Sequence, residues 1–328
     1  MRPRLRHRGR GFGIIRKRKV VGKVPLPRPV ARILKEIAND RLHGAHWLTL
    51  QAAEALRLLA AKAEGAGFEE QLLAMAQLLA AAQPRMASLL NLTNAVLLAA
   101  EKSAGKAGLT EAVSEAAYAF AGGMEKHAEK AAVRFSSCLK KRSVILTHSS
   151  SDSVKQALAY AWRRKRLERV IVTESRPLFE GRRLAVELGR DGIPVTIIAD
   201  AAMLDALRAA DAALVGADAV TVEGVVNKTG TALLALAARV CRKPFYVLCG
   251  SEKLLAAGLK LADEPARDPR ELLPQVARGV TVMNRYFDLT PLEWLTAVIT
   301  EDGMLAPAEL KKSLRRLRVH PALLSTQR

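Results

Sequence analysis

The sequence predicts an α/β protein in which a helical N-terminal domain is followed by a Rossmann-like domain with a doubly wound parallel sheet. Three observations support this fold class. Apolar residues recur at helical spacing through the first part of the chain, without a strand-like pattern. Short β-branched runs that alternate with helical segments begin at Ser143. The length of 328 residues also suits two domains.

Residues 29–141 are predicted to form the helical domain. A first helix is indicated by apolar residues, three and four positions apart, that share one face: Val30, Ile33, Leu34 and Ile37. Further helices are expected over Leu48–Ala63, Glu69–Ala82, Pro84–Ser103 and Thr110–Leu139. Gly122 and Gly123 are expected to break the last helix, because glycine disfavours a helix interior.

Residues 142–328 are predicted to form the Rossmann-like domain. Short apolar runs predict strands over Val144–Thr147, Arg169–Thr173, Pro194–Ala199, Ala212–Val215 and Phe245–Cys249. Helices are expected between them, over Ser153–Lys165, Arg182–Arg190, Ala202–Ala209 and Thr229–Val240. This alternation is typical of a parallel sheet covered on both faces. A surface excursion, an extended segment and two helices are expected to follow, over Pro265–Asn284, Tyr286–Pro291, Leu292–Thr300 and Ala308–Arg318.

The net charge of +20 is concentrated at the N-terminus. Eleven Lys and Arg residues lie between Arg2 and Arg28, and the first acidic residue is Glu36. So basic a segment has too little apolar surface to fold alone, which predicts a disordered basic arm over residues 1–28. Contact with RNA or the ribosome through phosphate neutralisation is one interpretation of this arm, and a solvated extension is the other.

The cysteines give no sign of a metal or disulfide framework. There are three, Cys138, Cys241 and Cys249, without metal-ligand spacing. An odd number in a chain that shows no signal peptide fits a reducing compartment, so we expect a cytoplasmic protein with no metal and no cofactor. No apolar run is long enough to span a membrane, and no membrane contact is expected.

Polar and basic residues follow the predicted strands. Ligands of doubly wound sheets bind beyond the carboxyl ends of the strands, so these residues are expected to converge at one edge. They include His148, Ser149, Ser150, Arg176, Asp218, Asn227, Lys228 and Lys253. Helix N-termini, hydroxyl groups and basic side chains together are what a phosphate site requires, and Asn227–Thr229 is expected to open a helix there. Asp218, an acid among cations, suits a proton acceptor or a partner for sugar hydroxyls.

Each of these residues also has a structural interpretation. Ser149–Ser151 could cap the helix that follows, with or without a ligand. His148 could be a buried structural histidine rather than a catalyst. Arg176 could belong to a surface turn before Pro177, and Asn227–Thr231 to a hairpin that leads into a helix. Their common position at strand ends favours a site.

Several strings in the second half resemble, in order and spacing, one known family. They are VILTHSSSDSV, VTESRPLFEG, VGADAVTVEGVVNKTGT, the Lys253 segment and FDLTPLEWLTAVITEDGML, while LHGAHWLTLQAAEAL and QPRMASLLNLTNAV carry a weaker resemblance in the first half. The family is that of the translation initiation factor 2B alpha, beta and delta subunits, which also contains ribose 1,5-bisphosphate isomerase and 5-methylthioribose 1-phosphate isomerase. The resemblance implies a helical domain, a Rossmann-like domain and dimerisation through the latter.

The resemblance also implies roles for individual residues. The isomerases use the aspartate of the GAD motif, which is Asp218, and a cysteine directly after Thr-His, where this sequence has Ser149. They use arginines where this sequence has His43 and Gln83, the latter before Pro84, and Gly44 and Ala45, which follow His43, are expected to contact the ligand. Positions that contact phosphate or sugar match Arg176, Asn227, Lys228 and Lys253. A serine hydroxyl has a far higher pKa than a thiol and cannot simply replace it.

Three functions are therefore compatible with the sequence. The first is a regulatory protein that binds a phosphorylated sugar or nucleotide, as the Thr-His-Ser string of the translation-factor alpha subunits implies. The second is an aldose–ketose isomerase acting on ribose 1,5-bisphosphate or a related ribose phosphate, with Asp218 as its acid/base group. The third is an RNA-associated binding module that uses the basic arm. A homodimer or higher homo-oligomer is expected in each case.

Overall fold

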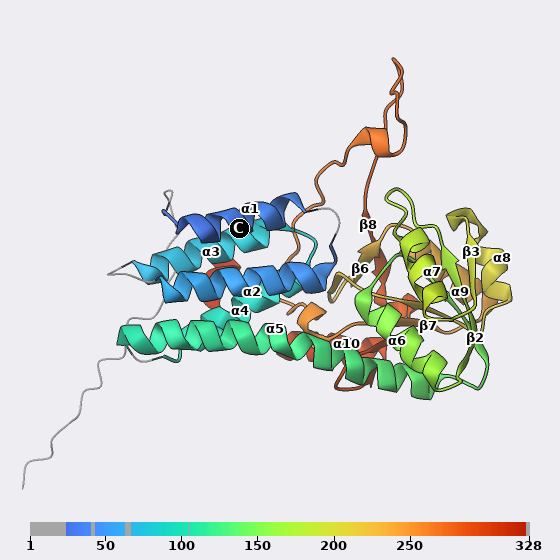
Figure 1. The fold of residues 1–328 in the computed structure, drawn as a ribbon, viewed down its shortest axis with the longest axis horizontal. Helices are drawn as coiled ribbons and strands as arrows, with labels where there is room; N and C mark the ends of the chain where they lie inside the picture. The colour runs from blue at the N-terminus through green and yellow to red at the C-terminus, as the bar shows by residue number, and fades with distance from the viewer. Residues whose placement is uncertain (1–23, 41–42, 63–66, 104, 326–328) are drawn as a thin grey trace, which may run out of the picture.

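A computed structural model describes residues 24–40, 43–62, 67–103 and 105–325 (Figure 1). The first 23 residues of the predicted basic arm lie outside the described residues, so its disorder and its contact with RNA stay predictions. None of the described helices combines the length and the apolar character that crossing a membrane requires.

The first part of the chain is helical, as predicted. Its helices are α1 (Arg28–Asn39), α2 (Ala45–Ala61), α3 (Phe68–Ala82), α4 (Ala87–Ala100) and α5 (Gly105–Cys138). Among the described residues, no strand precedes Ser143. These helices bury one core, which also takes in Leu255, Ala256 and Leu259 from much later in the chain. The helical region is thus tied to the sheet domain by packing.

The prediction that Gly122 and Gly123 break the last helix was wrong, because α5 is continuous. Ala117 and Ala121 belong to the core of the helical region, whereas Ala131 and Phe135 belong to one core of the sheet domain. Burial on both sides of the glycines stabilises the helix more than two glycines cost, about 1 kcal/mol each. Figure 1 shows α5 running past both parts of the molecule, with its C-terminal end far from α1–α4.

The second part of the chain contains the predicted parallel sheet. The strands are β1 (Ser143–Thr147), β2 (Leu167–Thr173), β3 (Val195–Ile198), β4 (Ala212–Val215), β7 (Phe245–Leu248), β9 (Ala297–Ile299) and β10 (Met304–Leu305). Their order is β10-β9-β7-β4-β1-β2-β3, and only the pairing of β10 with β9 is antiparallel. The chain builds one side of the sheet from β1 to β3 and then crosses to β4, which makes the gap between β1 and β4 the topological switch point.

Helices cover both faces of this sheet. On one face, α6 (Asp152–Arg163) and α7 (Glu180–Arg190) pack with the end of α5 in one core. On the other, α8 (Met203–Arg208), α9 (Thr231–Cys241) and α10 (Pro307–Arg316) pack in a second core. The side chains of β1 alternate between them: Ile145 belongs to the first core, and Val144 and Leu146 to the second. A short helix, α11 (Pro321–Ser325), ends the described chain.

A small antiparallel sheet of β5 (Ala219–Val220), β6 (Gly224–Lys228) and β8 (Phe287–Pro291) was not predicted. It shows that Asn227 and Lys228 end a strand rather than open a helix, since α9 begins at Thr231. Asn227 pairs with Asp288 across β6 and β8, a partner far away in sequence. The excursion before β8 projects from the body, as expected (Figure 1).

The predicted helix over Leu292–Thr300 was also wrong. A single 3₁₀ turn at Leu292–Trp294 leads into the buried strand β9. Its Ala-Val-Ile sequence pairs in parallel with β7, so burial in the sheet overrides the local helical pattern.

Candidate functional site

A cavity of about 100 Å³ lies at the carboxyl edge of the sheet, beside the switch point. The loop after β1 and the loop after β4 form two of its walls, and they approach closely because Gly216 carries no side chain: a Cβ there would lie 2.7 Å from Ser151 Oγ. The cavity brings together most of the predicted site residues: Gly44, Ala45, Ser149, Ser150, Asp218, Asn227 and Lys253. His148, Arg176 and Lys228 do not line it.

Two helix N-termini contribute to this cavity. Gly44 is the N-cap of α2, and Ala45 and His46 form its first turn. Ser151 is the N-cap of α6, and its side chain makes no capping hydrogen bond. Free backbone N–H groups and the positive ends of two helix dipoles therefore converge from the helical region and the sheet domain. This arrangement favours a bound anion.

Asp218 is held at the join between the two regions. Its backbone N–H donates to the Val226 carbonyl (2.9 Å), and its own carbonyl accepts from the N–H of Ala87, the first residue of α4 (3.0 Å). Burial raises the pKa of its carboxyl above the ordinary value, and the charges of Lys253 and Lys228 oppose that shift. A carboxyl in such surroundings can accept and return a proton.

The cations near Asp218 differ in their availability. Lys228 is buried and forms an ion pair with Glu180, and its ammonium lies 4.9 Å from the centre of the Tyr286 ring. Lys253 is also buried, and Arg183 reaches the cavity from α7. Within the described residues, neither Lys253 nor Arg183 has an ion-pair partner, so both charges are free for a ligand.

Ser149 lies in a strained turn at the end of β1. Its φ of 68° is in the left-handed region, and its N–H donates to Ser175 Oγ (2.7 Å). Ser175, with a φ of 63°, is in turn held through its N–H by Asp200 (2.7 Å). The loops after β1, β2 and β3 are thereby fixed to one another, with Ser149 and Ser150 on the cavity wall.

His148 is buried beneath these loops, with both ring nitrogens engaged. Nε2 lies 2.8 Å from the Thr229 carbonyl and Nδ1 lies 2.6 Å from Thr173 Oγ1. Burial lowers the pKa of His148, which favours a neutral ring that donates from Nε2 and accepts at Nδ1. This geometry supports a structural role for His148, joining the ends of β1 and β2 to the turn before α9.

Arg176 lies on the surface, outside the cavity. Its guanidinium stacks over the Phe179 ring at 4.9 Å and donates to the Glu271 carbonyl (3.3 Å) in the projecting excursion. Its backbone N–H donates to Asp200 (2.8 Å). In this arrangement Arg176 connects the excursion to the loop after β2.

His43 and Gln83 stand at the two positions where the resemblance implies arginines, and both contact other residues of the helical region. His43 lies 2.6 Å from Asp40 Oδ2 and stacks on Trp47. Gln83 donates to the Ile37 carbonyl (2.8 Å) at the end of α1. Neither residue lines the cavity.

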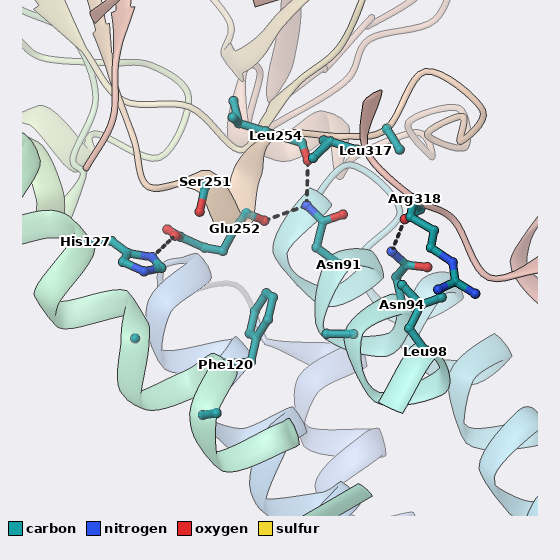
Figure 2. A pocket seen from close by; sticks show the side chains of 14 residues that line it. Asn91, Asn94, Leu98, Phe120, His127, Ser251, Glu252, Leu254, Leu317 and Arg318 are labelled. Carbon is teal, nitrogen blue, oxygen red and sulfur yellow. Dashed lines mark hydrogen bonds and ion pairs between the residues drawn. The ribbon is translucent and has the colours of Figure 1, made fainter. Parts of the chain in front are cut away.

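A second cavity, of about 330 Å³, adjoins the first (Figure 2). Glu252 lines both, and its carboxylate accepts from His127 of α5 (3.2 Å), which also lies 3.4 Å from Glu301. The Glu252 hydrogen bond raises the pKa of His127, since it favours the charged ring. Asn91 of α4 donates to the carbonyls of Glu252 (2.8 Å) and Leu254 (2.9 Å), so the helical region holds the loop that carries Lys253.

All three cysteines lie in the described part of the chain, and none lines the first cavity. Cys249 is buried at the end of β7, and burial raises the pKa of its thiol to about 12. No cysteine therefore supplies a thiolate to the cavity beside Ser149.

Sequence reasoning missed Arg183, His46 and Glu252 on the cavity wall. Arg183 follows the predicted start of α7 by one residue, so the rule that helix N-termini face this edge could have found it. The positions of His46 and Glu252 on the cavity wall depend on how the helical region docks onto the sheet domain. Docking of this kind leaves no local pattern in the sequence.

Comparison with known proteins gives consistent similarities. A model of the Initiation factor 2 subunit family matches residues 41–307. The chain is 33% identical to a translation initiation factor eIF-2B subunit 2-like protein of Pyrococcus furiosus, over 86% of this chain and 98% of the relative. It is 31% identical to ribose 1,5-bisphosphate isomerase of Thermococcus kodakarensis, over 85% and 91%. The crystal structure of the Pyrococcus horikoshii translation initiation factor eIF-2B is similar with a TM-score of 0.75 and 34% identity, over 86% and 98%.

Proposed function

Because this chain belongs to the Initiation factor 2 subunit family, we propose that it binds a phosphorylated sugar or nucleotide in the first cavity as a regulatory ligand. The observation that carries the proposal is the convergence of two helix N-termini, α2 and α6, on a cavity that also holds the free cations Lys253 and Arg183. A phosphate dianion is the kind of group that helix N-termini and basic side chains bind.

The residue at position 149 supports binding without turnover. A sugar-phosphate isomerisation needs groups that exchange protons with two neighbouring carbons. Asp218 can be one of them, but the Ser149 hydroxyl ionises far above neutral pH and has no base within hydrogen-bonding distance among the described residues. Ser149 is therefore a hydrogen-bonding group for the ligand.

Isothermal titration of the full chain with ribose 1,5-bisphosphate, 5-methylthioribose 1-phosphate and AMP tests the binding. Lys253→Met keeps an unbranched side chain one atom shorter and removes its charge, so it should weaken binding of the ligand by about 10-fold to 100-fold, as expected for a hydrogen bond to a charged group. Lys312→Met, on the surface of α10, is the matched control and should change nothing. Equal affinities for the two variants would refute the assignment of Lys253.

An isomerase is the second candidate, and Asp218 is the observation that favours it. Its carboxyl is half-buried in the first cavity and has a raised pKa, and relatives include ribose 1,5-bisphosphate isomerase. Ketose production from ribose 1,5-bisphosphate that disappears in Asp218→Asn would establish this candidate over the regulatory one.

We also propose that the chain forms a homodimer in the cytoplasm. An apolar stripe on α9 supports a dimer: Leu233, Leu236 and Val240 are 54%, 44% and 69% exposed. Light scattering should report a dimer for the full chain and a monomer for Val240→Glu. Val186→Glu, at an exposed valine of α7, should remain a dimer; dissociation of both variants, or of neither, would contradict this surface.

A further inference from the structure

The amino edge of the parallel sheet, opposite the candidate site, is densely basic. Lys140, Lys141 and Arg142 precede β1, and Arg163, Arg164 and Lys165 precede β2. All six side chains are exposed. We propose that this edge binds the phosphate backbone of single-stranded RNA.

The basic turns form one continuous strip. The sheet places β3, β2, β1, β4 and β7 side by side, and the turn before each strand lies at the same edge. The turns before β1 and β2 touch, since Ser143 N–H donates to the Arg166 carbonyl (2.8 Å). Arg190 ends α7 next to this pair, and Arg242 and Lys243 precede β7 at the other end. With strands about 4.8 Å apart, the strip is roughly 20 Å long.

Acidic residues neutralise this strip only in part. Glu168 pairs with Arg142 (3.2 Å) and Asp205 with Arg208 (3.2 Å), while Asp211 accepts the Val144 N–H (2.8 Å). No ion pair joins the other basic residues of the strip to any described residue: Lys140, Lys141, Arg163, Arg164, Lys165, Arg190, Arg242 and Lys243. Asp191, in the turn before β3, and Asp211, in the turn before β4, are acidic residues of the same edge, but the basic residues outnumber them. The edge is therefore net positive and attracts a partner with many negative charges.

The chemistry of the edge favours a nucleic acid. Regularly spaced phosphates can be neutralised one by one along such a strip, with release of counterions. Tyr160, half-buried at the end of α6, already stacks under Arg164 at 5.4 Å and offers a surface on which an unpaired base can stack. A membrane would need exposed apolar side chains to insert, but Leu139, the apolar residue of the turn before β1, is buried.

The strip is separate from the phosphate cavity, which lies at the other end of the same strands. RNA binding and small-ligand binding can therefore be lost independently. The two proposals are tested by different variants and do not depend on each other.

Fluorescence anisotropy of the full chain with a labelled single-stranded RNA of mixed sequence tests the inference. The edge variant is Lys141→Glu/Arg163→Glu/Lys165→Glu. The control, Lys35→Glu/Lys312→Glu/Arg315→Glu, has the same change of charge at exposed residues elsewhere. The N-terminal arm is common to all three proteins, so its contribution cancels. Both variants should keep the unfolding midpoint of the wild type, as surface substitutions usually do.

The edge variant should bind RNA at least about 10-fold more weakly, with a salt dependence shallower by about 2 in the logarithmic slope, while the control stays close to wild type. Equal weakening in both variants would overturn the proposal, since it would reduce the effect to net charge. Absence of RNA binding by the wild type would also overturn it. A third result would also overturn the proposal: the edge variant binds RNA as the wild type does but loses binding to phosphatidylserine-containing vesicles. That result would identify a membrane-binding surface instead.

Discussion

The first turn of α7 depends on a glycine at its contact with β2. A Cβ on Gly181 would lie 1.8 Å from the Thr173 carbonyl oxygen and 2.7 Å from Ser175 Oγ, where ordinary contact begins at 3.4 Å. The carbonyl belongs to a buried strand and cannot turn aside. We therefore predict that Gly181→Ala pushes the start of α7 away from the sheet.

The cost follows from this geometry. Overpacking a well-packed core typically costs about 1–3 kcal/mol, and the upper part of this range applies because the clash is with backbone rather than with a flexible side chain. Glu180 and Arg183 move with the helix, so the pairing of Lys228 and the cavity wall are both disturbed. Ligand binding should weaken together with stability.

Urea unfolding of Gly181→Ala and Gly189→Ala gives the measurement. Gly189 lies on the same helix, and a Cβ there meets nothing within 4 Å, so alanine should stabilise by about 0.5–1 kcal/mol through its better helix propensity. Opposite signs for the two variants are expected. Stabilisation by both would refute the close packing of α7 on β2.

Three further predictions concern single side chains. Ser149→Cys should gain measurable ketose formation from ribose 1,5-bisphosphate by NMR, whereas Ser150→Cys should not. The Glu252 hydrogen bond raises the pKa of His127 above 6.5, so its stabilisation is complete below pH 6.5 and lost as pH rises through the raised pKa; His127→Gln should remove that loss from the urea-unfolding profile. Burial raises the pKa of Asp288 from 3.8 to about 6, so wild-type stability should fall relative to Asp288→Asn by roughly 2 kcal/mol as the pH rises from 4 to 6.

Each of these has a contrary outcome. An inactive, folded Ser149→Cys would mean that the thiol is not the missing group. If the stability of His127→Gln changes with pH in parallel with that of the wild type, the ion pair of His127 with Glu252 does not contribute to stability. A constant stability difference between wild type and Asp288→Asn across pH 4 to 6 would show that the backbone N–H groups of Gly230, Thr231 and Ala232, at the start of α9, outweigh burial.

Local sequence patterns were enough for the parallel sheet and its covering helices. Runs such as Val144–Thr147 are buried on both faces, so their apolar composition is unambiguous. The segment around β9 was mispredicted because Leu292–Thr300 has helical spacing, while its structure is decided by pairing with β7. The small antiparallel sheet was missed because β6 pairs with β8, which lies some sixty positions later along the chain.

The candidate site shows the same division. Ser149, Asp218 and Lys253 were placed at strand ends by topology alone, and the structure brings them to one cavity. His46 and Glu252 could not be found in this way, because they reach the cavity through the docking of α2 and through the loop that Asn91 holds. Conversely, Arg176 lies at a strand end but contacts Phe179 and the excursion instead.

We propose above that the first cavity binds a phosphorylated sugar without converting it to the ketose. The direct measurement is a ³¹P NMR spectrum of ribose 1,5-bisphosphate with a stoichiometric amount of the full chain, followed over time. We predict that the phosphate resonances shift or broaden, that Lys253→Met abolishes this change, and that no ketose signal appears. Conversion to the ketose, or a spectrum identical to that of the free sugar phosphate, would contradict the proposal.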